Sequence, residues 1–169
     1  QEGWDQPGFD DRNWKESLAT REPLGLLKPE SDYPLKIMQV FEPGNIIRKK
    51  DSIFLYDFEQ NASGIVKLKV QGKKGQVVRL VPGELIGDDT LVTQKASGEP
   101  NYFSYILKGD KEEIWIPRFS YYGFRYVEAE GAVPEGEPNP NSLPVITGLN
   151  LLHTRNSSPA GGSFKCSSE

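Results

Sequence analysis

Residues 64–81 decide the fold class, and their sequence is Gly-Ile-Val-Lys-Leu-Lys-Val-Gln-Gly-Lys-Lys-Gly-Gln-Val-Val-Arg-Leu-Val. From Val66 to Val70 every second residue is apolar and the residues between are polar, as in a strand with one buried face. The two glycines within residues 72–75 can take the positive φ of a tight turn, and the apolar pattern resumes over residues 76–81. The stretch therefore predicts a β-hairpin.

Short alternating segments bounded by Gly, Pro, Asn or Asp recur along the chain, at residues 35–41, 52–58, 101–107, 112–116, 124–129 and 145–154. With 17 Gly and 13 Pro among 169 residues, the chain is interrupted too often for long helices. Parallel sheets need helical crossovers, and no amphipathic stretch of that length is present. The sequence predicts an all-β fold, an antiparallel β-sandwich of the jelly-roll or concanavalin-like kind, with short helical turns only.

The predicted helical turns are residues 10–18, where an aspartate at the start could cap the segment, and a turn near residues 82–86. Residues 131–142 are rich in Gly and Pro without an apolar period, so we expect an exposed loop before the last strand. Residues 156–169 are rich in Ser and Gly and have the composition of a linker.

Charge and composition exclude several functions. The net charge is −4, from 20 Lys and Arg against 24 Asp and Glu, so we expect neither nucleic acid nor an anionic membrane as a partner. No apolar stretch approaches the roughly 20 residues that a membrane span requires. One Cys and one His, Cys166 and His153, cannot supply a structural zinc site, and a Ser-His-Asp or Cys-His nucleophile is equally unexpected.

The first candidate site is residues 57–64, Asp-Phe-Glu-Gln-Asn-Ala-Ser-Gly, at the end of one predicted strand and the start of the next. Asp57, Gln60 and Asn61 offer paired donors and acceptors that could bind the neighbouring hydroxyls of a sugar. The favoured alternative is a turn in which the Asn and Ser side chains bond the local backbone.

The second candidate is the aromatic segment of residues 115–126. Trp115 or Tyr122 could stack on the C–H face of a sugar ring while Arg118 or Arg125 bonds its hydroxyls. Strand alternation sends about half of the rings into the core, so core or domain-interface packing is the favoured interpretation.

The third candidate is acidic and comprises Glu84, Asp88 and Asp89. Two facing carboxylates could hydrolyse a glycosidic bond, and several oxygens could hold calcium. Adjacency in sequence establishes neither geometry, and a solvated loop is favoured.

A longer ordered series of motifs is more specific. Asp-Phe-x-Gln-Asn-x-x-Gly at 57–64 is followed by Gly-x-x-Gly at 72–75, Glu-Leu at 84–85, Tyr-Ile-Leu-Lys-Gly at 105–109 and Trp-x-Pro-Arg-Phe-x-Tyr-x-Gly-Phe-Arg-Tyr-Val-Glu at 115–128. The series resembles the β-sandwich domain that precedes the catalytic domain of bacterial α-L-rhamnosidases.

The resemblance implies three parts: the tail of an upstream β-sandwich module with its connector at residues 1–34, the sandwich at 35–155, and a linker toward a catalytic (α/α)6 barrel at 156–169. The chain begins with Gln rather than Met, from which we expect a processed protein or part of a longer one. In the family the catalytic acids lie in the barrel, so the resemblance assigns no catalytic residue to this chain.

Two positions depart from the family pattern. Glu59 stands where the family usually has Gly, and Tyr122 stands where it usually has His. Neither belongs to the alternating apolar pattern, so the predicted fold does not depend on them.

The resemblance leads us to expect a non-catalytic domain of an α-L-rhamnosidase, an inverting glycosidase acting on terminal rhamnose, that scaffolds the barrel. The alternative is a carbohydrate-binding module for rhamnosyl glycans, and an independent hydrolase using Glu84 is a more remote third. Expected partners are the catalytic and upstream domains of the same polypeptide, with no cofactor and with calcium unsupported. The family's usual substrates suggest a periplasmic or secreted location. Eight residues are candidates for carbohydrate or domain-interface contacts: Asp57, Gln60, Asn61, Glu84, Trp115, Arg118, Tyr122 and Arg125.

Overall fold

The computed structural model describes residues 3–21, 25–98, 100–109 and 111–167. The chain separates into two compact units, residues 1–31 and residues 32–169. No helix long and apolar enough to cross a membrane occurs in the ranges just given.

The first unit holds no helix or strand within its described residues, so the helical segment predicted at residues 10–18 is wrong. The carboxylate of Asp10 accepts hydrogen bonds from the backbone and the guanidinium of Arg12, and a single turn brings the ring centroid of Trp14 within 5.4 Å of that of Phe9. Beyond the turn Leu18 is exposed. A short helix without an apolar surface to pack against is marginal in water, which explains why the turn does not continue.

In the part of the second unit that the structure describes, the regular elements are all strands: β1 (Leu35–Phe41), β2 (Asn45–Lys50), β3 (Ile53–Gln71), β4 (Val77–Gly83), β5 (Leu85–Ile86), β6 (Val92–Thr93), β7 (Phe103–Ile106), β8 (Glu113–Trp115), β9 (Tyr122–Glu130), β10 (Val133–Pro134) and β11 (Val145–Asn156). All their pairings are antiparallel except that of β10 with β11. The predicted all-β antiparallel fold is confirmed, without the helical turns: residues 82–86 are the end of β4, a bend at Glu84 and β5.

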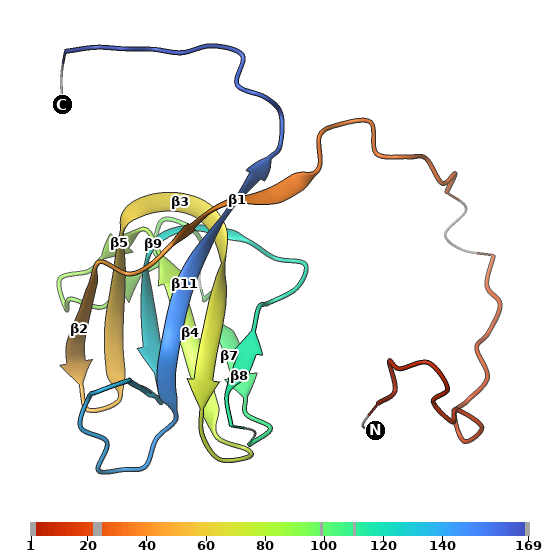
Figure 1. Cartoon of the computed structure of the whole chain (residues 1–169), viewed down its shortest axis with the longest axis horizontal. Coiled ribbons are helices and arrows are strands. Elements are labelled where there is room, and N and C mark those ends of the chain that lie inside the picture. The colour runs from red at the N-terminus through yellow and green to blue at the C-terminus, as the bar shows by residue number, and fades with distance from the viewer. Residues whose placement is uncertain (1–2, 22–24, 99, 110, 168–169) are drawn as a thin grey trace. The chain divides into compact units, whose positions relative to one another are not determined.

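The strand β3 belongs to both layers of the sandwich. Its first half pairs with β2 and β9, and β9 continues the layer to β4 and β7. Its second half pairs with β11 and β8, and β11 continues the other layer to β1. The start of β9 also pairs with β3 beyond the bend, at residues 62–64. Figure 1 shows β3 arching over the top of the sandwich between the two layers. The two strands predicted at residues 52–58 and 64–71 are therefore one bent strand of 19 residues.

The core lies between the layers. Phe54, Tyr56 and Phe58 of the first half of β3 share it with the predicted row Val66, Leu68 and Val70 of the second half. Phe124, Val127 and Ala129 of β9 and Leu149 and Leu151 of β11 complete its centre. The alternation seen in the sequence thus marks the inward-facing residues.

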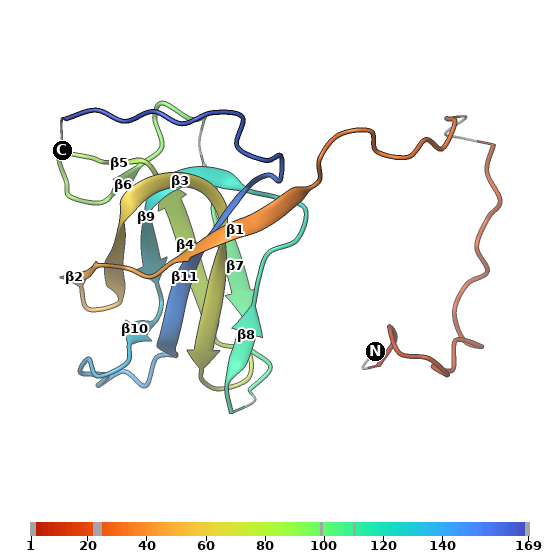
Figure 2. The same ribbon diagram turned by 45° about the horizontal axis from the view of Figure 1, so that its top comes forward.

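The loop predicted at residues 131–142 is only partly exposed. Ala132 and Val133 are buried in the core, and β10 pairs with the start of β11. Figure 2 shows β10 beside the lower end of β11. Packing of Ala132 and Val133 in the apolar core, together with pairing of β10, therefore buries the beginning of a segment whose composition is that of a loop.

Candidate functional site

The bend of β3 brings five of the eight candidate residues together. The pairing of β3 with β9 shifts register between Asp57 and Ala62, and Glu59 within this gap has a φ of 63°. A positive φ turns the chain in a way that regular strand geometry does not, so the strand crosses from one layer to the other at this point. We call Asp57, Gln60, Asn61, Glu84 and Arg125 the β3 bend cluster.

The centre of the β3 bend cluster is an ion pair. Both guanidinium nitrogens of Arg125 that face Asp57, Nε and Nη2, donate to its two carboxylate oxygens at 2.8 Å. The backbone N–H of Glu59 donates a further bond to Asp57 Oδ1 at 2.7 Å. The hydrogen bonds from Arg125 hold the pKa of Asp57 below its ordinary value of 3.8. The Asp57 carboxylate is therefore ionised and already bonded, and suits a structural role better than that of a general acid.

The other members of the β3 bend cluster also bond one another. Asn61 Nδ2 donates to Glu84 Oε1 at 2.9 Å, and Gln60 Nε2 donates to the backbone oxygen of Asn61 at 2.8 Å. A Cβ placed on Gly123 would lie 3.2 Å from the same Glu84 oxygen, so the glycine leaves space for this carboxylate. The favoured turn interpretation, in which the Asn and Ser side chains bond the local backbone, is therefore wrong. Asn61 bonds a side chain 23 positions away, and Ser63 Oγ donates to the backbone oxygen of Thr154, 91 positions away. The segment is a bend within one strand.

The aromatic candidates Trp115 and Tyr122 lie on β8 and at the start of β9, and both rings contact Phe103 of β7. The Trp115 ring stacks on Tyr105 with centroids 5.2 Å apart and meets Phe103 edge-on at 6.2 Å. Tyr122 meets Phe103 at 5.4 Å. Both candidate rings therefore pack against the core, as the favoured interpretation predicts.

Arg118 is exposed and lies with Trp115 along an open groove of about 880 Å³ that continues through residues 116, 117 and 120. The residue that follows it, Phe119, is fully exposed and has a φ of 61°. The sequence placed Phe119 in the aromatic segment but gave no signal that its ring would point outward, because alternation fails in a loop.

The acidic candidates do not meet as one group. Glu84 bonds Asn61, while Asp89 Oδ1 accepts the backbone N–H of Leu91 and closes its own turn. Among the residues that the structure describes, no three His, Cys, Asp or Glu side chains lie close enough to hold a metal ion together.

A second cavity has no counterpart in the sequence predictions. It is a pocket of about 280 Å³ between β2 and the start of β11, which we call the β2–β11 pocket. Tyr56 of β3 reaches it from the core, and Ile46, Lys69, Glu42, Glu135 and Asn150 also line it. These residues come from five separate segments, so no local motif could have revealed the pocket.

Fold and motifs together define a concanavalin-like β-sandwich domain of the bacterial α-L-rhamnosidase kind. The family described as "Bacterial alpha-L-rhamnosidase concanavalin-like domain" matches residues 47–150, and the chain belongs to this family. The predicted resemblance is thereby confirmed.

Relatives and solved structures agree with this assignment. An alpha-L-rhamnosidase of Formosa agariphila is 30% identical over 98% of this chain. One of Streptomyces avermitilis is 36% identical over 90% of this chain. The chain covers only 17% and 14% of these two relatives. The structure of the alpha-L-rhamnosidase from Dictyoglumus thermophilum superimposes with a TM-score of 0.84, at 29% identity, over 99% of this chain and 18% of that one. The structure of the Streptomyces avermitilis alpha-L-rhamnosidase complexed with L-rhamnose superimposes with a TM-score of 0.73, at 31% identity. The match covers 94% of this chain and 15% of that one.

Proposed function

We propose that the chain is a non-catalytic domain of an α-L-rhamnosidase that removes terminal rhamnose, and that it scaffolds the catalytic domain of the same polypeptide. Its family membership and its small share of each relative's length support this role. In this arrangement residues 1–34 connect to an upstream module, residues 35–155 form the sandwich, and residues 156–169 lead to the catalytic barrel.

The observation that carries the proposal is the conformation of Phe119. A bulky residue at a positive φ costs about 1–2 kcal/mol relative to a relaxed backbone. Its ring is fully exposed within the chain, so packing inside this domain does not offset that cost. Ile114, Ile116 and Tyr121 are also exposed beside it in sequence. A neighbouring domain that receives the Phe119 ring would offset the strain.

The test compares one substitution in two settings, the 169-residue chain and the whole polypeptide that contains it. Phe119→Gly relieves the backbone strain and removes the ring. We expect the thermal midpoint of the chain alone to rise and that of the whole polypeptide to fall, because only the latter loses the docked ring. Phe119→Ala keeps the strain, so it should leave the chain nearly unchanged and lower the midpoint of the whole polypeptide.

Thr90→Gly is the matched control, because Thr90 is exposed with a φ of 64° and lies outside this surface. It should raise the midpoint in both settings. If Phe119→Gly also raises both, Phe119 is not docked and the proposal fails. Hydrolysis of an aryl rhamnoside by the 169-residue chain alone would likewise contradict a non-catalytic role.

The alternative of a carbohydrate-binding module stays a prediction at the eight candidate residues, with little geometric support there. Asp57 and Arg125 bond each other, and the ring of Trp115 stacks on Tyr105. Neither arrangement leaves a free planar ring beside free hydrogen-bonding groups, which is what sugar binding at these residues would require.

A further inference from the structure

The β2–β11 pocket contains a buried hydroxyl that the fold does not use. Tyr56 is 2% exposed, and its Oη is buried without a hydrogen-bond partner among the described residues. An unpaired buried hydroxyl is unfavourable, and such groups in native proteins call for an explanation. Phenylalanine would fill the same space without this cost. The hydroxyl therefore points to a partner that is not part of this chain.

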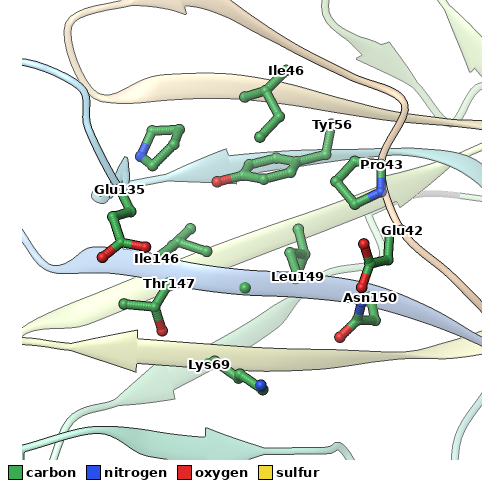
Figure 3. Close-up of a pocket in the computed structure, with 12 residues that line it drawn as sticks. Glu42, Pro43, Ile46, Tyr56, Lys69, Glu135, Ile146, Thr147, Leu149 and Asn150 are labelled. Carbon is green, nitrogen blue, oxygen red and sulfur yellow. The ribbon is translucent and has the colours of Figure 1, made fainter.

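Free polar groups stand at both ends of the same pocket. Figure 3 shows the Tyr56 hydroxyl directed to the side of Glu135, with Glu42 and Asn150 at the opposite end. Within the described part of the chain, the side chains of Glu42, Glu135 and Asn150 make no hydrogen bond or ion pair. Glu135 is exposed as well as unbonded, so its side chain can move to admit a ligand to Tyr56.

The surfaces between these ends are apolar. Pro43 and Ile46 lie on one side of the pocket and Ile146 and Leu149 on the other. A pyranose ring combines hydroxyls around its rim with C–H groups on its faces, and this pocket has the matching distribution of polar and apolar groups.

Size and charge narrow the ligand class. A volume of about 280 Å³ is just under the roughly 300 Å³ at which pockets for drug-sized ligands begin, so the ligand is small. Two carboxylates against the single ammonium of Lys69 disfavour an anion. Burial raises the pKa of Tyr56, so its phenol stays protonated and can donate a hydrogen bond.

We propose that the β2–β11 pocket binds a neutral saccharide ring. Tyr56 and Glu135 bond hydroxyls at one end of the ring, and Glu42 and Asn150 bond hydroxyls at the other. None of these four residues is among the eight candidates from the sequence. The site is independent of the scaffold role, because the surface around Phe119 can dock a neighbouring domain whether or not this pocket is filled.

The test is calorimetric titration of the 169-residue chain with single compounds of similar size. L-rhamnose and D-galactose serve as neutral rings, D-glucuronate as an anionic ring and L-arginine as a cation. We expect saturable binding of at least one neutral sugar with a Kd of about 1 mM, and binding of D-glucuronate at least about tenfold weaker.

Substitutions then locate the binding. Tyr56→Phe should weaken sugar binding about three- to tenfold while raising or preserving the thermal midpoint without sugar, because it removes the unpaired hydroxyl. Glu135→Gln should weaken binding about tenfold, since hydrogen bonds to charged groups are stronger. Glu137→Gln is the matched control, because Glu137 is exposed two residues further on and does not line the pocket. It should not affect binding.

Three results would each overturn the proposal. The first is no heat of binding from either neutral sugar well above millimolar concentration. The second is sugar binding that survives both Tyr56→Phe and Glu135→Gln, which would place it elsewhere. The third is saturable binding of L-arginine alone, which would make the pocket a receptor for a cationic side chain. None of these results affects the outcome of the Phe119 experiment. Sugar binding in the β2–β11 pocket and the scaffold role can therefore be refuted independently of each other.

Discussion

Asp57 and Arg125 form a two-point ion pair that joins the bend of β3 to β9 across 68 positions of sequence. The Asp57 side chain is 15% exposed and that of Arg125 is 38% exposed. Bidentate contacts of this kind fix geometry as well as charge. The pair lies at the register shift where β3 passes from one layer to the other, so it secures the point on which the sandwich topology depends.

Asp57→Asn should therefore destabilise the chain. We expect the free energy of unfolding at pH 7 to fall by about 1–3 kcal/mol, because Arg125 loses a charged partner. Asp51→Asn is the control: Asp51 is 89% exposed in its pair with Arg48, and its replacement should cost less than about 0.5 kcal/mol. Urea unfolding of the two variants checks the difference, and equal losses would contradict the prediction.

The same pair makes a prediction about acid stability. The folded-state pKa of Asp57 lies below its ordinary value of 3.8, so its stabilisation is complete above that value and is lost as pH falls through the folded-state pKa. Unfolding free energies measured at a series of acidic pH values should fall less steeply for Asp57→Asn than for the unaltered chain. If the unfolding free energies of the two proteins fall in parallel with pH, the ion pair of Asp57 and Arg125 does not contribute to acid stability.

Glu113 should be essential to the connection between β7 and β8. The residue is 5% exposed, and its carboxylate accepts bonds from the hydroxyl of Tyr105 and the backbone N–H groups of Lys108 and Gly109 at 2.7–2.9 Å. Glu113→Ala leaves these donors without that acceptor, so we expect a loss of about 2–4 kcal/mol in unfolding free energy. Chemical denaturation measures it. The neighbouring Glu112→Ala, which removes one exposed bond, should cost well under half as much.

Unlike the carboxylates of Asp57 and Glu113, the ionised carboxylate of Glu128 should lower the stability of the chain near neutral pH. Burial is the main cause that raises its pKa above 4.5, and the charges of Glu130 and Asp89 add to it. Because the folded-state pKa is the higher one, the chain loses stability as pH rises from about 4.5 through that value, and the loss persists above it.

Glu128→Gln keeps an oxygen for the backbone N–H of Val92, which Glu128 Oε2 now accepts at 3.1 Å. We expect this variant to be more stable at pH 7 by up to about 1 kcal/mol and to lose the decline with rising pH. Thermal unfolding between pH 4 and pH 8 would show both effects. Glu137→Gln, in an exposed loop, should change neither, and a Glu128→Gln variant that is less stable at pH 7 would refute the assignment.

The alternation of apolar and polar residues predicted those features of the fold that depend on each strand by itself. Alternation identified the inward row from Val66 to Val70 because period-two burial is a property of each strand by itself. It missed the continuity of β3, because a strand that bends at Glu59 is held together by pairing with β9 on both sides of the bend. It also missed β10, because its place beside β11 and the packing of Val133 in the core depend on segments that are distant in the sequence.

For the candidate sites too, the sequence predicted what depends on neighbouring residues and missed what depends on the arrangement of the strands. Asp57, Gln60 and Asn61 were found because they are close in sequence, and the bend keeps them close in space. Their bonds to Arg125 and Glu84 depend on strand order, which the sequence does not encode locally. The β2–β11 pocket escaped prediction entirely, since its lining comes from separate segments and its most informative atom, Tyr56 Oη, lies on a residue that alternation assigns to the core.

Glu59 gives the sharpest test of the bend, because its φ of 63° is one that glycine adopts freely and other residues adopt at a cost. This explains why glycine suits the position in the family pattern that the sequence resembles. Its carboxylate also lies so close to Gly44 that a Cβ there would clash with it. Glu59→Gly should raise the unfolding free energy, by about 1 kcal/mol or less because glycine also makes the unfolded chain more flexible. Glu59→Ala removes the same carboxylate but keeps the Cβ, so it should bring no such gain. If both variants change stability equally in urea titrations, the effect comes from the lost carboxylate and the backbone at the bend is not strained.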